Sequence, residues 1–371
     1  MKVLGLVLAG GRGENLRPFT DIRASAALPI FGKYRAIDFT LSNMVNAGIS
    51  KVGIITQYNP RSLMDHIGSG KEWDLDRKQG GLFFLQPFFR LSSQSIGYKG
   101  TADAIFQNMT ILRRGNEDFV LIGSGDHIYK MDFRDLFRAH INNGADITLL
   151  SVPFSESSKD IIRVEGGKVI NWYRDITPSD IEEKENLSES AGVYFINKFL
   201  LRELLFSCVP DGKDNLVEII SENLSSLKVM EYKFKGFWSN LTTDVSKYFK
   251  TNLDILNPDI RKELFYKHGK VYTKLKDLPP PKITTTGRVS NALVSDGSII
   301  SGSVINSVIF RNVKILSGAV VENSIIMEGC VIEEGAKLKN VIMDKDARVR
   351  SSRKLLGSTE IPAVVEKSGV I

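Results

Sequence analysis

The hydrophobic positions divide the chain into two stretches with different periods. In roughly the first 250 residues, short apolar runs alternate with segments of helical periodicity, as is typical of an α/β fold. Four apolar runs predict strands over 2–8, 51–56, 119–123 and 146–152. Two amphipathic segments, each followed closely by a glycine, predict helices over 38–47 and 136–143. We therefore expect a mainly parallel sheet covered by helices on both faces.

The second stretch follows a hexad rhythm from about residue 289 to about residue 350. An aliphatic residue with a small or short residue two positions earlier recurs along it, and the aliphatic members are spaced 6, 6, 5, 6, 6, 5 and 6 residues apart. The pairs are Ser307/Ile309, Val313/Ile315, Ala319/Val321, Ser324/Ile326, Cys330/Ile332, Ala336/Leu338, Val341/Met343 and Ala347/Val349. This sustained period favours a triangular parallel β-helix over a run of ordinary antiparallel strands, in which alternate residues are also apolar.

A run of prolines separates the two stretches. Leu278-Pro279-Pro280-Pro281 is expected to be rigid and extended, because proline fixes φ and removes a hydrogen-bond donor. We therefore expect an α/β domain over 1–262, a proline-containing linker over 263–288 and a β-helix domain over 289–371.

Composition and charge narrow the class of protein. A chain of 371 residues can bury a full core in two or three domains, and 42% hydrophobic with 25% charged residues is ordinary for a globular protein. The net charge of +6 mildly favours anionic small molecules, but Lys and Arg are scattered, so we expect no nucleic-acid partner. Cys208 and Cys330 lie far apart, as expected in a reducing cytoplasm. Met1-Lys2 runs directly into the first strand, and no apolar stretch reaches the ~20 residues of a membrane helix, so we expect neither a leader nor a membrane partner.

A glycine-rich turn follows the first strand. In Leu8-Ala9-Gly10-Gly11-Arg12-Gly13, backbone N–H groups can face phosphate. A loop that holds a polyanion usually adds a cation, but the next positions carry Glu14 and Asn15. Asp126 follows another apolar strand, and open α/β sheets place ligand groups at such strand ends.

Several motifs together resemble the bacterial ADP-glucose pyrophosphorylases (glucose-1-phosphate adenylyltransferases) over nearly the whole chain. They include the glycine loop, Phe31-Gly32-Lys33-Tyr34-Arg35, Gly100-Thr101-Ala102-Asp103 and Ser124-Gly125-Asp126-His127. The resemblance implies a Rossmann-like nucleotidyltransferase domain followed by a left-handed β-helix. It also implies that the phosphate of glucose 1-phosphate attacks the α-phosphorus of ATP, while Mg²⁺, Arg and Lys neutralise charge.

The resemblance also assigns binding residues. The nucleotide-binding positions are Leu8, Ala9, Gly10, Gly11, Gly13, Gln57, Gly100, Thr101 and Asp126. The sugar-phosphate positions are Ser190, Gly192 and Tyr194. Simpler interpretations remain open: Gln57 as a surface residue, Thr101 as a helix cap and Asp126 as a turn residue.

The chain departs from the family where charge matters most. The family's loop Arg falls on Asn15, its first Lys on Ser25, its sugar-phosphate Lys on Asp175 and its second metal Asp on Asn240, so that only Asp126 is retained. Loss of one preorganised phosphate-stabilising charge costs a factor of about 10²–10³ in rate. We therefore expect little turnover, and Mg²⁺ binding that is weak or absent.

This pattern is similar to that of the GlgD-type subunits of bacterial glycogen biosynthesis. It implies a regulatory, catalytically impaired subunit that joins a catalytic ADP-glucose pyrophosphorylase subunit in a hetero-tetramer, with ATP, ADP-glucose or sugar phosphates as effectors. One alternative is an active adenylyltransferase with relocated cations, for which the candidates are Arg12, Arg17, Arg23, Lys33 and Arg174. Another is a scaffold whose nucleotide pocket is a relic.

Overall fold

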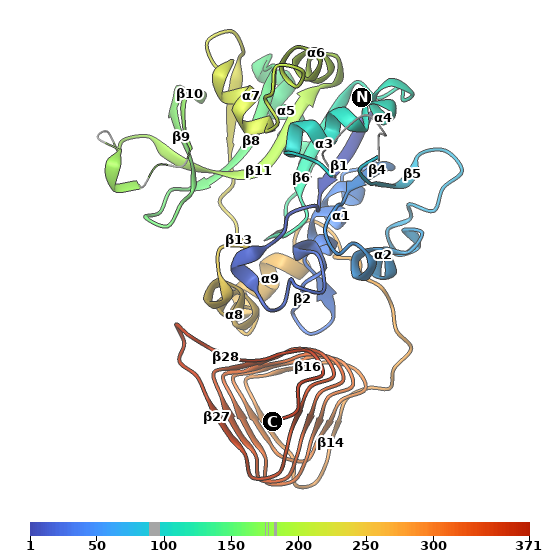
Figure 1. Cartoon of the computed structure of the whole chain (residues 1–371), viewed down its shortest axis with the longest axis vertical. Helices are drawn as coiled ribbons and strands as arrows, with labels where there is room; N and C mark the ends of the chain where they lie inside the picture. The colour runs from blue at the N-terminus through green and yellow to red at the C-terminus, as the bar shows by residue number, and fades with distance from the viewer. Residues whose placement is uncertain (89–96, 175, 177, 182–183) are drawn as a thin grey trace.

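The computed structural model describes residues 1–88, 97–174, 176, 178–181 and 184–371. An α/β domain and a triangular β-helix pack against each other, with α8 (Val245–Asp254), α9 (Pro258–Tyr266) and β2 (Pro29–Ile30) at the junction (Figure 1). Among the helices of the described residues, none has the length and apolarity of a membrane span.

One nine-stranded sheet forms the centre of the α/β domain, in the order β5-β4-β1-β6-β11-β8-β12-β10-β9. The first four strands are parallel: β5 (Gly81–Leu85), β4 (Lys51–Ile55), β1 (Val3–Leu8) and β6 (Phe119–Ser124). The others are β11 (Leu187–Asn197), β8 (Ile147–Pro153), β12 (Val229–Lys233), β10 (Lys168–Arg174) and β9 (Asp160–Glu165). Here β8 and β12 are parallel, whereas β11 and the β9–β10 hairpin run antiparallel to their neighbours. The parallel part therefore lies at the N-terminal half of the chain, where the first three predicted strands were placed.

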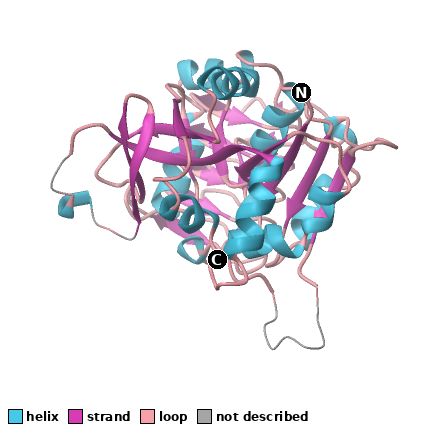
Figure 2. Ribbon diagram, turned by 90° about the horizontal axis from the view of Figure 1, so that it is seen from above, coloured by secondary structure: helices cyan, strands magenta, loops and turns pink. Residues whose placement is uncertain are grey.

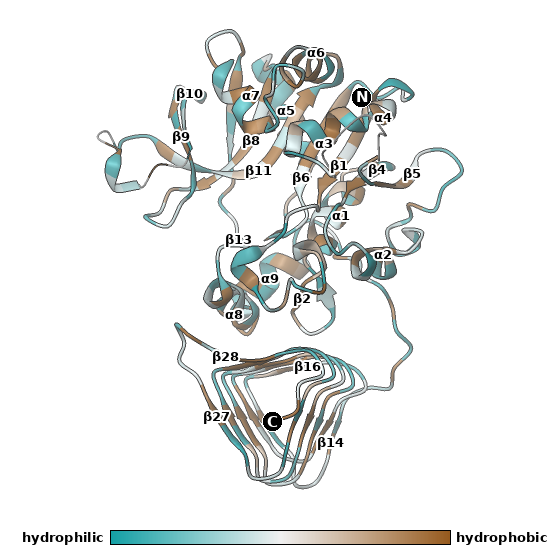
Figure 3. Cartoon of the chain, in the orientation of Figure 1, coloured by the Kyte–Doolittle hydropathy of each residue, from teal (hydrophilic) through white to brown (hydrophobic). Residues whose placement is uncertain are grey.

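Helices cover both faces of this sheet (Figure 2). They are α1 (Ile37–Asn46), α2 (Arg61–Ile67), α3 (Thr101–Gln107), α4 (Met109–Arg113), α5 (Phe133–Asn143), α6 (Lys198–Cys208) and α7 (Leu216–Glu222). Alternate residues of β6 enter opposite hydrophobic clusters: Val120 and Ile122 pack in one, and Leu121 in the other. The central strands β1, β6 and β8 are accordingly hydrophobic along their length (Figure 3). Helix α5 begins at Phe133, ahead of the predicted start, because Asp132 caps it.

Three five-stranded parallel sheets form the left-handed β-helix. The first contains β14 (Lys282–Ile283), β17 (Ile299–Ile300), β20 (Lys314–Ile315), β23 (Val331–Ile332) and β26 (Arg348–Val349). The second contains β15 (Arg288–Ser290), β18 (Ser303–Ile305), β21 (Val320–Glu322), β24 (Lys337–Lys339) and β27 (Lys354–Leu356). The third contains β16 (Leu293–Val294), β19 (Val308–Ile309), β22 (Ile325–Ile326), β25 (Val341–Met343) and β28 (Ala363–Val365).

The predicted hexad pairs lie inside these coils. Ser303 pairs with Val320 and Val320 with Lys337, so the chain returns to the same sheet after 17 residues. That period equals one set of the predicted 6, 6 and 5 spacings. Every member of the eight predicted pairs is at most 1% exposed. The periodicity therefore predicted both the coil and its interior.

The linker between the domains lies against the α/β domain. Helix α9 ends at Tyr266, and the chain then crosses α1, where the Tyr272 N–H donates to Ser42 Oγ at 2.8 Å. The first coil begins with β14 at Lys282, ahead of residue 289. An apolar cluster that includes Phe31, Val308 and Ile325 joins the two domains.

Candidate functional site

The loops that follow three parallel strands meet at one edge of the sheet. The Ala9 N–H, after β1, donates to the carbonyl oxygen of Ile55 at the end of β4, at 2.8 Å. The Gly125 N–H, after β6, donates to the carbonyl oxygen of Leu8 at 2.9 Å. The structure therefore brings the glycine loop, the Gln57 segment and Asp126 together, as expected at the carboxyl ends of parallel strands.

The glycine loop is shaped by close contacts. Gly13 has φ +61°, and a Cβ there would lie 2.8 Å from Cγ2 of Thr20, so a side chain at this position would be strained and crowded. Thr20 Oγ1 also donates to the Gly13 carbonyl oxygen at 2.8 Å. Gly10 lies beside Gln57, because a Cβ on Gly10 would be 3.6 Å from the Cβ of Gln57.

Both carboxylate oxygens of Asp126 accept hydrogen bonds from serines. Ser25 Oγ donates to Oδ2 at 2.7 Å, and Ser124 Oγ donates to Oδ1 at 2.6 Å. Ser25 is fully buried in a short 3-10 helix, Ser25–Ala27. His127 Nε2 lies 3.8 Å from Oδ1. Ser25, which the resemblance places at the position of the family's first Lys, is thus a hydroxyl donor to Asp126.

Asn240 is bonded within its own turn. Its Oδ1 accepts from the Thr242 N–H at 2.9 Å and from Thr242 Oγ1 at 2.7 Å. Asn15 Nδ2 donates to the Thr242 carbonyl oxygen at 3.4 Å, and the Leu241 N–H donates to the Asp126 carbonyl oxygen at 3.3 Å. The structure therefore joins Asn15, Ser25, Asp126 and Asn240 in one cluster through these contacts, while Asp175 lies outside the described residues.

At the two metal positions implied by the resemblance, the cluster offers one carboxylate and one amide. Magnesium binds through carboxylate oxygens and keeps near-ideal octahedral geometry. Asp126 is the only carboxylate at the two implied metal positions, and both of its oxygens are bonded to hydroxyls. Within the part of the chain that the structure describes, no group of three or more His, Cys, Asp or Glu could hold a metal ion.

Four of the five candidate replacement cations contact acidic or aromatic side chains. Arg12 bonds Glu14 and lies 4.8 Å from the ring centroid of Tyr58. Arg17 pairs with Asp21 at 3.1 Å, Arg23 pairs with Asp344 at 2.8 Å, and Lys33 lies 5.5 Å from the ring centroid of Tyr34. Arg174 faces Asp160 across the β9–β10 ladder, at the sugar side of the cleft.

The segment from Gly97 to Thr101 is packed against both Gln57 and α7. Gln57 Oε1 accepts from the Tyr98 N–H at 3.1 Å. Gly100 caps α3, and a Cβ there would lie 2.4 Å from the Asp214 carbonyl oxygen. Thr101 is the first helical residue rather than the cap, and its Oγ1 accepts from the Leu216 N–H at 2.9 Å. The Thr101 hydroxyl thus ties α3 to α7.

The three predicted sugar-phosphate residues lie on β11, around an irregularity in its pairing with β8. Ser190 Oγ lies 3.3 Å from the Tyr194 hydroxyl oxygen, and Gly192 adopts φ +67°. Trp172 Nε1 donates to the carboxylate of Asp160, which also receives a hydrogen bond from Ser190. Burial raises the pKa of the Asp160 carboxyl and that of the Tyr194 hydroxyl. These polar groups therefore bond to one another.

A cavity of about 240 Å³ adjoins this network, between Glu189 on β11, Trp238 and Asn240 on β13 (Trp238–Asn240), and Lys247 on α8. Glu189 accepts from Ser158 Oγ at 2.7 Å, and burial raises the pKa of its carboxyl. The cavity lining therefore carries both a carboxyl group, from Glu189, and an ammonium group, from Lys247.

Sequence reasoning missed several residues of the cleft: Ser124, Thr242, Asp160, Trp172 and Glu189. A signal was present for Ser124, because it lies two residues before Asp126 at the end of the same strand. Asp160 begins a strand far from any motif, so nothing in the sequence marks its contact with Ser190.

Comparisons with known proteins agree with this architecture. Residues 4–257 match the Nucleotidyl transferase family, and residues 279–358 match the GlmU-like, C-terminal hexapeptide family. The glucose-1-phosphate adenylyltransferase of Thermotoga neapolitana is 38% identical over 331 residues, which cover 86% of this chain and 76% of the relative. The enzyme of the same name from Geobacillus stearothermophilus is also 38% identical, with 86% and 83% covered, and that from Mycoplasma mobile is 36% identical, with 86% and 84% covered. The nucleotidyltransferase fold, the terminal β-helix and this level of identity together place the chain in the glucose-1-phosphate adenylyltransferase family.

Proposed function

We propose that this chain is a catalytically impaired subunit that regulates a competent member of its family in bacterial glycogen synthesis. Its partner would be a catalytic ADP-glucose pyrophosphorylase subunit in a hetero-tetramer. The cleft would bind ATP, ADP-glucose or a sugar phosphate as an effector. Binding there would alter the partner through different affinities in two states of the assembly.

The bonding of Asp126 carries the proposal. Transfer of a nucleotidyl group needs charge at the phosphates, and here the carboxylate is bonded to Ser25 and Ser124 instead. Asn240 supplies no charge, and its oxygen is bonded to Thr242. The cleft has thus kept its glycine loop but lacks the charges that the reaction uses.

An active enzyme with relocated cations is the second candidate, and Arg174 favours it. Arg174 pairs with Asp160 in the β9–β10 register, at the sugar side. Burial is the main influence on the pKa of the Asp160 carboxyl and raises it, and the charge of Arg174 opposes this shift. A cation there could meet a sugar phosphate. The two candidates differ in whether the purified chain turns over on its own.

The first test is ADP-glucose formation by the chain alone, by a competent homologue alone and by the two together. We expect background activity from this chain alone and a changed rate or effector response in the mixture. Substantial activity from the chain alone with Mg²⁺ supports the second candidate. A mixture that behaves as the sum of its parts supports a scaffold with a relic pocket.

The second test restores the charges by combining Asn15→Arg, Ser25→Lys, Asp175→Lys and Asn240→Asp. We expect measurable adenylyltransferase activity, because each restored charge contributes about 10²–10³ in rate in comparable sites. The control is Ser225→Lys, which adds a cation at an exposed position outside the cleft. Background activity in a combined variant that still unfolds cooperatively contradicts our assignment of these positions.

A further inference from the structure

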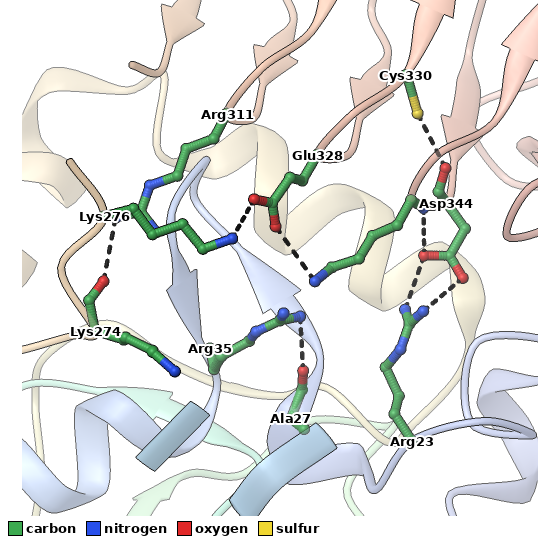
Figure 4. Close-up of polar contacts among 10 residues, drawn as sticks. Arg23, Ala27, Arg35, Lys274, Lys276, Arg311, Glu328, Cys330 and Asp344 are labelled. Carbon is green, nitrogen blue, oxygen red and sulfur yellow. Dashed lines mark hydrogen bonds and ion pairs between the residues drawn. The ribbon is translucent and has the colours of Figure 1, made fainter. Parts of the chain in front are cut away.

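A single buried segment connects the β-helix to the cleft. Arg23 bonds Asp344 of the β-helix through two nitrogens, NH1 to Oδ1 at 2.8 Å and NH2 to Oδ2 at 2.9 Å (Figure 4). The two side chains are 3% and 2% exposed. Only Ala24 separates Arg23 from Ser25, the residue that bonds Asp126. The β-helix thus holds the chain two residues away from the cleft.

Asp344 is fixed on the β-helix side. Its N–H donates to the Val365 carbonyl oxygen at 2.8 Å, and its own carbonyl oxygen accepts from Cys330 Sγ at 3.0 Å. Its Oδ1 also accepts from the Lys345 N–H at 2.7 Å. The carboxylate is therefore held by neighbouring coils and has little freedom to turn away from Arg23.

The segment on the other side of the ion pair is equally constrained. The Ala27 N–H donates to the Ala24 carbonyl oxygen at 2.9 Å, and the Leu28 N–H donates to the Ser25 carbonyl oxygen at 3.1 Å. Arg35 NH1 donates to the Ala27 carbonyl oxygen at 3.0 Å. Because all these residues except Arg35 are fully or almost fully buried, a displacement of Asp344 reaches Ser25 without being absorbed in a loop.

We propose that Asp344 is a positioning residue for the nucleotide cleft, and that through Arg23 it holds Ser25 against Asp126. Arg23 and Asp344 form a bidentate, charge-assisted pair that water does not reach, and breaking it would leave two buried charges unpaired. The 23–28 segment therefore moves with the β-helix. A shift of the β-helix relative to the sheet would then release Oδ2 of Asp126 and change how the cleft receives a nucleotide phosphate. The nucleotide part of this inference rests on the proposed function.

The test uses the full chain with both partners replaced, Arg23→Met with Asp344→Leu. Replacing both members avoids a buried charge without a partner, which would unfold the chain for an unrelated reason. We expect faster hydrogen exchange at the amides of Ala27 and Leu28. We also expect the dissociation constant of ATP, measured by calorimetry, to change by about five-fold or more, the lower range of coupling between sites.

The decisive measurement repeats the double replacement in a Ser25→Ala background. If Asp344 acts through Ser25, its replacement no longer changes the affinity for ATP there. A change of the same size with and without Ser25 overturns the proposal, as does a folded double variant with unchanged affinity and exchange. The matched control is Lys339→Met with Glu322→Leu, an exposed ion pair of the β-helix at 2.8 Å, which should alter neither readout.

Failure of the proposed function is distinguishable from failure of this inference. If the parent chain does not bind ATP, the nucleotide-binding regulatory role is contradicted. The exchange of the Ala27 and Leu28 amides still decides whether Asp344 holds the segment, because it requires no ligand.

Discussion

The two carboxylate oxygens of Asp126 accept hydrogen bonds from the hydroxyl groups of Ser25 and Ser124. The sequence predicted the loss of the family's Lys at Ser25, since the resemblance aligns the two positions. It could not predict that Ser25 and Ser124 would both reach Asp126, because a hydrogen bond depends on rotamers and on distances that only the folded chain sets. The hydrogen bonds of Asp126 could therefore not be predicted from the sequence.

The effect of burial on Asp160 can be tested through the pH dependence of the free energy of unfolding. Burial raises the pKa of the Asp160 carboxyl in the folded chain above the ordinary value of 3.8, so the folded chain holds the proton more tightly than the unfolded chain between the two values. Stability is therefore lost as the pH rises through that window. We expect Asp160→Asn, which cannot ionise, to have a larger free energy of unfolding than the parent chain at pH 7. The gain should shrink as the pH falls to 3.8, in urea unfolding followed by circular dichroism.

Asp118→Asn is the control, since this aspartate is bonded to the exposed Lys2 N–H. A smaller free energy of unfolding for Asp160→Asn at pH 7 would show that the ionised carboxylate is needed by Trp172 and Ser190, and would contradict the argument from burial.

Among the larger elements, the β-helix was predicted best because its signal is repeated. Eight pairs of residues indicate the same 17-residue coil, so the prediction does not depend on any single ambiguous position. Only the first strand of the first coil, β14, lies wholly before the predicted start at residue 289, because Lys282 and Ile283 are both exposed and carry no inward aliphatic signal. In the sheet, the antiparallel course of β11 could not be predicted, because a buried strand has the same apolar run in either direction.

The stacked interior of the β-helix should be intolerant of cavities. Ile326 is fully buried between the coils. We expect Ile326→Ala to lower the free energy of unfolding by about 2–5 kcal/mol, through lost transfer energy and the remaining cavity. Ile305→Ala removes the same atoms at a position that is 38% exposed, and it should cost much less. Equal losses in thermal unfolding of the two variants would contradict the assigned interior.

Across the whole molecule, the domain junction combines apolar packing with an excess of positive charge. Phe31 and Ile325 belong to one apolar cluster that spans the two domains. Beside it, Lys276 and Lys345 both pair with Glu328. Arg35 lies near Glu328 and Lys276 (Figure 4). Burial of like charges is costly unless each is paired. The stability of the junction should therefore respond to pH above neutrality.

Lys345 should carry much of that response. Burial, and then the nearby Arg35, lowers its pKa from the ordinary value of 10.5 to about 8, with Glu328 opposing and Arg23 adding to the shift. Between about 8 and 10.5 the folded chain gives up this proton before the unfolded chain does, so the contribution of Lys345 to stability rises with pH. Lys345→Met should therefore remove an upward slope from the free energy of unfolding measured over this range by chemical denaturation. Lys339→Met, which removes an exposed lysine of the same β-helix, should leave the slope in place. Parallel curves for the parent chain and Lys345→Met from about pH 8 to 10.5 would show that burial at the junction does not lower the pKa of Lys345.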